Sequence, residues 1–237
     1  MTRIQVVTKG QAAGSGMGIE ERRKREREAR KLNIVRAARK LFYEKGFKDV
    51  TVAHIARKAE LSKGAFYLYF TSKEEIYAQI LLSELDKIYN VVLSSINNGQ
   101  SATKMLIDFA EIYIDTFLKD RESFRKIMTF MLQTDHPNLS ENLNQSLIKS
   151  TNKTIDIVGT ILQRGVEGRE FPPNLDIWQS RNIVWGMLNG IISLYLFTGK
   201  EASREKVIKS MIRAGLDHFI EGIKNSTTPM NALYGQG

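Results

Sequence analysis

The side chains best suited to chemistry lie close together in one stretch of the N-terminal third. They carry hydroxyl, phenol and ammonium groups, and they belong to Thr51, Ser62, Lys63, Tyr67, Tyr69 and Lys73. Each group can donate a hydrogen bond, and no nucleophile stands beside a base. Such donors, together with free backbone N–H groups at helix N-termini, are natural ligands of phosphate oxygens. The stretch therefore favours binding of a phosphate-bearing partner over catalysis.

Two short helices joined by a turn are predicted to position these donors. Thr51 is a plausible N-cap for the first helix, and Ser62 can cap the second after a turn at Glu60-Leu61. In the second helix Phe66 and Phe70 share one face and are expected in the core. Lys63, Ala65, Tyr67 and Tyr69 then lie on other faces of that helix.

A longer helix is predicted to precede this pair. Its apolar face consists of Ile34, Ala38, Leu41 and Phe42. Gly46 is expected to end it as a left-handed cap. Together the three helices indicate a helix-turn-helix, in which one helix enters the major groove of DNA and the preceding helix fixes its angle through phosphate contacts. Gly64 and Ala65 keep the entering helix thin.

The charge distribution also indicates an anionic partner for this part of the chain. The whole chain of 237 residues carries a net charge of +9. Residues 1–73 hold 18 Lys and Arg against 7 Asp and Glu, a balance of +11, whereas residues 74–237 hold 17 against 19, a balance of −2. A basic end on a near-neutral remainder is typical of a module for an anionic polymer or a membrane surface, attached to a part with another task.

Composition argues against several other kinds of site. The chain has no cysteine, which removes disulfides, thiolate nucleophiles and cysteine-ligated metals. His54, His136 and His218 are isolated single residues without metal-ligand spacing. We therefore expect no enzyme, no metal and no cofactor. The most apolar stretch, Ile183–Thr198, is too short to span a membrane, and with no secretory signal visible the protein is expected in the cytoplasm.

Residues 30–80 resemble the DNA-binding domain of the tetracycline-repressor (TetR) family. The resemblance is carried, in the family's order and spacing, by ARKLFYEKGF (Ala38–Phe47), TVAHIARKA (Thr51–Ala59) and LSKGAFYLYFTSKEEIY (Leu61–Tyr77). It covers about a fifth of the chain. Glu60-Leu61 departs from the family, in which glycine followed by an apolar residue is commonest. A slightly strained turn is expected there.

The resemblance implies roles for individual residues. Base-edge contacts fall on Lys63, Gly64, Ala65 and Tyr67, and phosphate contacts fall on Thr51, Tyr67, Tyr69 and Lys73. It also implies that a fourth helix leaves this module and enters a ligand-binding, dimer-forming domain.

The run Glu20–Lys31, EERRKREREARK, has two interpretations. It is either a solvated helix face with i, i+4 pairs such as Glu26 with Arg30, or an extension of the first helix that touches the DNA backbone or minor groove. The sequence leaves both open.

The remainder is predicted to be helical throughout, because sustained period-two alternation and hairpin signals are absent. The expected fold is all-α with about nine helices. Residues 1–18 are predicted to be a flexible leader, 19–72 a three-helix helix-turn-helix DNA-binding domain, 73–225 a ligand-binding and dimerisation domain, and 226–237 a flexible tail.

A helix predicted at residues 102–119 is apolar nearly all round, apart from a stripe of Asp108, Glu111 and Asp115. It is a candidate wall for a cavity that holds a flexible apolar effector. The candidate lining residues are Phe109, Tyr113, Phe117, Met128, Met131 and Trp185. The alternatives are an ordinary core for these residues and, for the acidic stripe, either a solvated face or a site that attracts a cationic ligand.

The last two helices, predicted at 175–198 and 202–224, are the candidates for a homodimer interface. A strip of small residues, Gly186, Gly190 and Ser193, would let another helix approach closely. The second of these helices adds Ile208, Met211, Ile212, Gly215 and Phe219. The alternative is that these faces are used inside one subunit.

These observations predict a ligand-responsive DNA-binding transcriptional regulator. We expect a homodimeric repressor that a small, largely apolar effector releases from a palindromic operator, with double-stranded DNA as the partner and no membrane. The alternatives are a basic helical protein that coats DNA without sequence preference and an enzyme of unrecognised chemistry.

Overall fold

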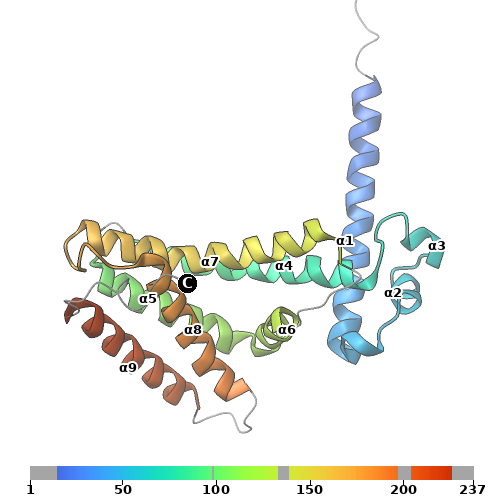
Figure 1. Cartoon of the computed structure of the whole chain (residues 1–237). Helices are drawn as coiled ribbons and strands as arrows, with labels where there is room; N and C mark the ends of the chain where they lie inside the picture. Colours follow the sequence, from blue (N-terminus) through green and yellow to red (C-terminus); the bar gives the residue numbers. More distant parts are fainter. Residues whose placement is uncertain (1–14, 98, 133–138, 197–203, 226–237) are drawn as a thin grey trace, which may run out of the picture. The chain divides into compact units, whose positions relative to one another are not determined.

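The structure is a computed structural model that describes residues 15–97, 99–132, 139–196 and 204–225 (Figure 1). Over these residues the chain forms nine α-helices and one 3₁₀ turn, and no strand. The elements are α1 (Ser15–Asp49), α2 (Val52–Lys58), α3 (Lys63–Phe66), α4 (Lys73–Val92), η1 (Leu93–Ser95), α5 (Ala102–Lys119), α6 (Arg121–Leu132), α7 (Glu141–Glu167), α8 (Ile177–Leu196) and α9 (Arg204–Asn225). The all-α prediction is confirmed.

The chain divides into two compact units, residues 1–80 and 81–237. The division falls within α4, eight residues after the boundary predicted between 72 and 73. The unit of residues 1–80 contains α1, α2 and α3, and its core includes Ile34, Ile55 and Phe66, all fully buried.

Helix α1 differs from the prediction at both ends. It begins at Ser15, so residues 15–18 of the expected leader are helical, while residues 1–14 lie outside the described part of the chain. At Gly46 the backbone takes φ 78° and ψ 161°, and helical structure continues to Asp49. The positive φ explains why glycine stands there. Gly46 therefore interrupts the helix instead of ending it.

The unit of residues 81–237 is built around α5. Helix α5 packs against α7 and α9, and α8 packs between those two. Leu106 and Phe109 of α5 and Leu188 of α8 are buried in the common core of these helices. Near the end of α7, a Cβ atom at Gly165 would lie 2.1 Å from the ring of Phe171, so only glycine allows this close approach.

The N-terminus of α5 is held by a residue from the connection between α7 and α8. The Glu170 carboxylate accepts hydrogen bonds from the backbone N–H groups of Ala102 (2.6 Å) and Thr103 (3.0 Å). Partial burial alone would raise the pKa of Glu170, but these hydrogen bonds and the charge of Lys224 outweigh burial and lower the pKa below its ordinary value. Glu170 thus neutralises free N–H groups at the positive end of α5.

Two classes of feature are absent from the described residues. None of their helices is long and apolar enough to cross a membrane. They also contain no group of three or more acidic or histidine side chains that could hold a metal ion.

Candidate nucleic-acid interface

Both N-caps predicted from the sequence are present in the structure. The Thr51 Oγ1 atom accepts the N–H of His54 (3.2 Å), and His54 Nδ1 accepts the N–H of Thr51 (3.4 Å), which closes a capping box at the start of α2. The Ser62 Oγ atom accepts the N–H of Ala65 (3.0 Å) at the start of α3. Because both hydroxyls act as acceptors in these bonds, their own O–H groups remain available to donate to another acceptor.

The turn between α2 and α3 is strained, as the sequence predicted. Glu60 adopts a φ of 58°, in the left-handed region that glycine occupies most easily. The Leu61 N–H then donates to the Ala56 carbonyl (2.9 Å), which fixes the direction in which the chain enters α3. Residue 60 therefore adopts the left-handed backbone conformation typical of glycine, although it is a glutamate.

Helix α3 ends at Phe66, earlier than the sequence predicted, and together with the turn that follows it separates a buried face from an accessible one. Phe66 and Phe70 are buried, whereas Lys63 is exposed and Tyr67 is half exposed. At Gly64 an added Cβ would meet only the Ser62 hydroxyl, at 3.9 Å, so the outward surface at this point is open. Ala65 and Tyr69 are half-buried. Base and phosphate contacts by these residues remain predictions, and the structure leaves Lys63 and Tyr67 free to make them.

Lys73 has a structural role that the sequence reasoning missed. Its ammonium group donates to the carbonyl oxygens of Phe47 (2.9 Å), Val50 (2.8 Å) and Lys48 (3.3 Å) and lies 4.4 Å from the centre of the Phe47 ring. All three protons are therefore used within the chain. A DNA phosphate would have to compete with these carbonyls, which lie in the last turn of α1 and just beyond its end at Asp49.

The candidate effector residues form an aromatic cluster in the other unit. Phe109, Tyr113 and Phe117 are buried, and the Tyr113 ring lies 5.2 Å from that of Trp185. Phe124, which the sequence did not single out, completes the cluster at 4.8 Å from Phe117. The predicted Met128 is half-buried against the same core. Met131 lies in α6, and its side chain falls outside the described part of the structure.

One polar pair lies in this aromatic cluster. The Tyr113 hydroxyl donates to Asn189 Oδ1 (2.9 Å), and Asn189 Nδ2 donates to the Trp185 carbonyl (2.9 Å). Burial raises the pKa of Tyr113 well above its ordinary value, and the hydrogen bond to Asn189 only partly offsets this. The phenol is therefore neutral and acts as a fixed donor.

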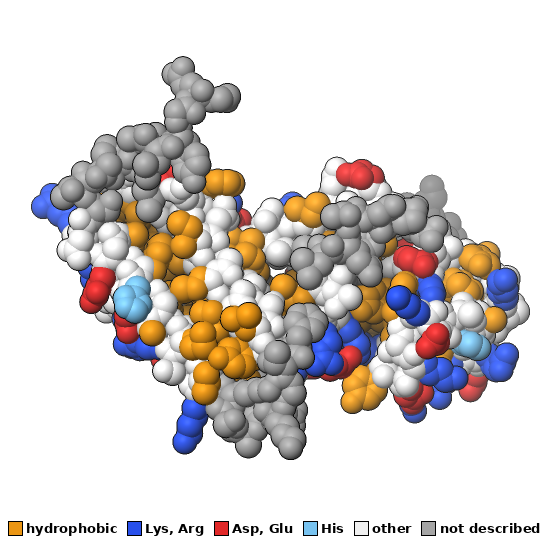
Figure 2. Space-filling view, turned by 60° about the horizontal axis from the view of Figure 1, so that its bottom comes forward, with side chains coloured by type: hydrophobic (Ala, Val, Ile, Leu, Met, Phe, Trp, Pro, Cys, Tyr) orange, Lys and Arg blue, Asp and Glu red, His pale blue; other side chains and the backbone are white. Residues whose placement is uncertain are grey.

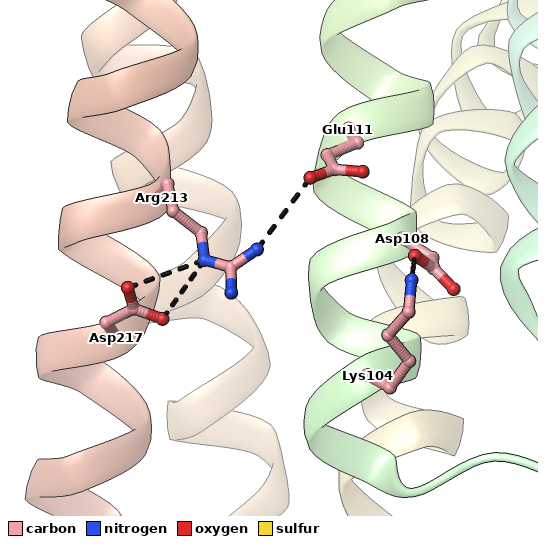
Figure 3. A network of polar contacts seen from close by, with 5 residues as sticks. All are labelled: Lys104, Asp108, Glu111, Arg213 and Asp217. Atoms are coloured by element: carbon pink, nitrogen blue, oxygen red, sulfur yellow. Dashed lines mark hydrogen bonds and ion pairs between the residues drawn. The ribbon is translucent and has the colours of Figure 1, made fainter.

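The acidic stripe of α5 is occupied by cations of the same chain. Asp108 pairs with Lys104, Glu111 lies 3.8 Å from Arg213 of α9, and Arg213 also pairs with Asp217 (Figure 3). Farther along the stripe Asp115 pairs with Lys209 at 2.8 Å. This surface is therefore an ion-pair network between α5 and α9, and a cationic ligand would have to displace it.

The predicted dimer residues separate into two groups. Ile208 and Ile212 are buried in the core, Phe219 packs against it, and a Cβ at Gly215 would meet the Met187 side chain at 2.6 Å. These positions of α9 are used inside the subunit. Gly186 and Gly190 have nothing within 4 Å of an added Cβ, Met211 is exposed and Ser193 is half-buried.

Apolar side chains do gather on the surface formed by α8 and α9 (Figure 2). Ile183 and Leu194 are exposed in line with Gly186 and Gly190 on α8, and Val207 is exposed one turn before Met211 on α9. We call Ile183, Gly186, Gly190, Leu194, Val207 and Met211 the α8–α9 apolar face. A dimer remains a prediction, and this face is the part of the predicted surface that is available for one.

Comparison with known proteins identifies the helix-turn-helix. Residues 34–80 match the family model described as bacterial regulatory proteins, tetR family. Over 68 residues the chain is 40% identical to the uncharacterized HTH-type transcriptional regulator YuxN of Bacillus subtilis, a match that covers 29% of this chain and 23% of that relative. It is 25% identical to the regulator YfiR of the same species over 75% of this chain and 85% of the relative.

Solved structures match over most of the chain. The TetR family transcriptional regulator PfmR of Thermus thermophilus matches with a TM-score of 0.59 and 25% identity, covering 81% of this chain and 99% of that chain. FadR of Bacillus subtilis, solved in complex with stearoyl-CoA, matches with a TM-score of 0.62 and 20% identity over 81% of this chain and 98% of that chain. With its helix-turn-helix, its all-α fold and these relatives, the chain belongs to the tetR family of bacterial DNA-binding transcriptional regulators.

Proposed function

We propose that this regulator binds a palindromic operator as a homodimer and acts as a repressor that an apolar effector releases. The observation that carries the DNA-binding part is the division of α3, which exposes Lys63 and half of Tyr67 above the buried Phe66 and Phe70. Lys63 suits the O6 and N7 acceptors of guanine in the major groove, and Tyr67 suits base edges or phosphates. The open surface at Gly64 supports close approach of the duplex.

Two subunits are needed for recognition of a palindrome. The α8–α9 apolar face supports this part of the proposal, because exposed apolar side chains beside small residues favour close helix packing between subunits. The two copies of α3 would then read half-sites about 34–36 Å apart.

For the effector we propose a molecule with a long apolar part. The aromatic cluster around Tyr113 supports an apolar ligand, and its fixed donor pair with Asn189 supports one that also carries an acceptor. The complex of the related FadR with stearoyl-CoA makes acyl-CoA thioesters the first class to test. By linkage, an effector that binds the DNA-free geometry more tightly must weaken operator binding by the same factor.

The DNA-binding part is tested with a duplex selected from a random library on the full-length protein. Lys63→Ala and Tyr67→Ala should each lose about 1–3 kcal/mol of preference for the selected duplex over random duplex. Lys149→Ala, an exposed lysine of α7, serves as the control and should behave as wild type. Equal affinity of the wild type for selected and random duplexes would instead support the DNA-coating alternative.

The effector part is tested by adding lauroyl-CoA, stearoyl-CoA or unacylated coenzyme A to the protein–duplex complex. Release by the acylated probes alone supports the proposed class. Release by coenzyme A alone, or by none of the three, would contradict that class and leave the DNA-binding result standing. Trp185→Ala, which opens the aromatic cluster, should change the concentration of acyl-CoA needed for release.

A further inference from the structure

The N-terminal part of α1 stands outside the core of its unit. Every residue from 18 to 30 is exposed, and the first fully buried one is Ile34. At 1.5 Å per residue this exposed segment is roughly 20 Å long. The segment continues a helix whose remainder is packed, but it has no core contacts of its own, so contacts with a partner would stabilise it.

Three arginines of this segment share one face. Arg23, Arg27 and Arg30 follow the i, i+4, i+7 spacing, and Ile34 continues the same line into the core. We call Arg23, Arg27 and Arg30 the α1 arginine face. It therefore projects from the side of α1 that carries the rest of the helix-turn-helix.

The α1 arginine face borders the end of the candidate reading helix. With Glu26 it lines a groove of about 530 Å³ whose other wall is formed by Leu68 and Tyr69. Arg27 Nη2 donates to the Leu68 carbonyl at 3.4 Å, a long bond that joins α1 to the turn after α3. Leu68 is 71% exposed, so this edge of the groove is open.

The charges of the groove are not balanced within the chain. Glu26, the acidic residue among those lining the groove, is paired with Arg22 at 2.9 Å. Among the described residues neither Arg23 nor Arg30 has an ion-pair partner. Like charges at i, i+3 and i, i+4 repel each other on a helix, so an anion lying along these arginines would stabilise the arrangement. Arginine is the side chain best suited to phosphate oxygens.

We propose that the α1 arginine face is a second DNA contact, which binds phosphates of the same duplex that α3 reads. This inference rests on the proposed function, because it needs α3 in the groove. The groove brings these arginines together with Tyr69, which is itself a predicted phosphate ligand, so one stretch of DNA backbone could contact both. These contacts would raise affinity and salt dependence and would add no base preference.

The test compares three full-length variants with wild type on one selected duplex across a salt series. The face variant is Arg23→Gln/Arg27→Gln/Arg30→Gln. The matched control, Lys24→Gln/Arg25→Gln/Arg36→Gln, removes the same charge from other sides of the helix and leaves the Arg22–Glu26 pair intact. The charge-retaining variant is Arg23→Lys/Arg27→Lys/Arg30→Lys. Circular dichroism and thermal unfolding establish that all variants are folded.

The face variant should bind the duplex at least about tenfold more weakly than wild type at 0.15 M salt, and the slope of log affinity against log salt should fall by about 2 to 5. The control should change affinity less than about threefold, and the lysine variant should retain most of the slope. Equal losses in face variant and control, or no loss in either, would overturn the inference. Failure of wild type itself to bind DNA would overturn the proposed function instead.

Discussion

At individual residues, interactions between neighbours in the sequence could be predicted, and interactions between distant residues could not. The caps by Thr51 and Ser62 were predictable because each joins atoms only three residues apart. The strained turn at Glu60 was predictable from the family's preference for glycine there. The carbonyl contacts of Lys73 were not, because they span 23 to 26 residues and exist only after α1 and α4 are placed.

Replacing Glu60 with glycine should stabilise the protein. The substitution removes the cost of a left-handed non-glycine residue and adds the entropic cost of glycine, for a net gain of up to about 1 kcal/mol in the free energy of unfolding. Denaturant unfolding measures it. Glu60→Val should lower the same free energy by about 1 kcal/mol, and a stabilised valine variant would contradict this account.

At the scale of the helices, two side chains bind backbone groups at the end of another helix. Lys73, at the start of α4, holds the carbonyls that end α1, and Glu170 holds the N-terminus of α5. The helices themselves were largely predictable, and α5 has the expected bounds. Helix α1 departs from the prediction at Ser15, where it begins inside the expected leader, and at Gly46, where a non-helical backbone kinks the helix and helical structure resumes up to Asp49.

Lys73→Met should mainly affect stability. It removes three charge-assisted contacts, so the free energy of unfolding should fall by about 2 kcal/mol. If the ammonium group is fully used inside the chain, the folded variant should keep the salt slope of DNA binding. A slope reduced by about 1 to 2 with unchanged stability would show instead that Lys73 binds phosphate.

Glu170→Gln should alter how stability depends on pH. Because folding lowers the pKa of Glu170 below its ordinary value of 4.5, its stabilising contribution is complete above that value and is lost as the pH falls through the folded pKa. At pH 7 the variant should be less stable by about 1 kcal/mol, as for loss of a helix cap. Thermal unfolding at several pH values should show the two proteins converging towards pH 3. A constant difference would contradict this role.

At the scale of the whole molecule, sequence alone could not separate core residues from exposed ones on the same helix. Ile208 and Met211 of α9 have the same apolar character, yet Ile208 faces the core and Met211 is exposed. The difference depends on how α9 rotates against α5 and α8, which no local pattern encodes. Phe109, Tyr113 and Trp185 do lie in one aromatic cluster, and their role in effector binding stays a prediction. Phe124 also belongs to this cluster, but it lies in a helix whose pattern gave no separate signal.

Leu194→Arg should prevent association of subunits. Leu194 is 60% exposed on the α8–α9 apolar face, so arginine there leaves the fold intact and places charge in the proposed interface. Light scattering should report a monomer, and affinity for the selected duplex should fall more than tenfold. Ile148→Arg, at an exposed position of α7, is the control and should keep the mass of wild type. Identical masses for the two variants would place the interface elsewhere.

The close approach of Gly165 and Phe171 has a consequence for the start of another helix. The Gly165 carbonyl accepts the N–H groups of both Glu170 (2.8 Å) and Phe171 (3.0 Å), and an added Cβ at Gly165 would lie 2.1 Å from the Phe171 ring. Any side chain at this position would therefore push aside the short connection that carries Glu170. A single hydrogen atom in place of a methyl group in α7 thus keeps the carboxylate in register with the first N–H groups of α5.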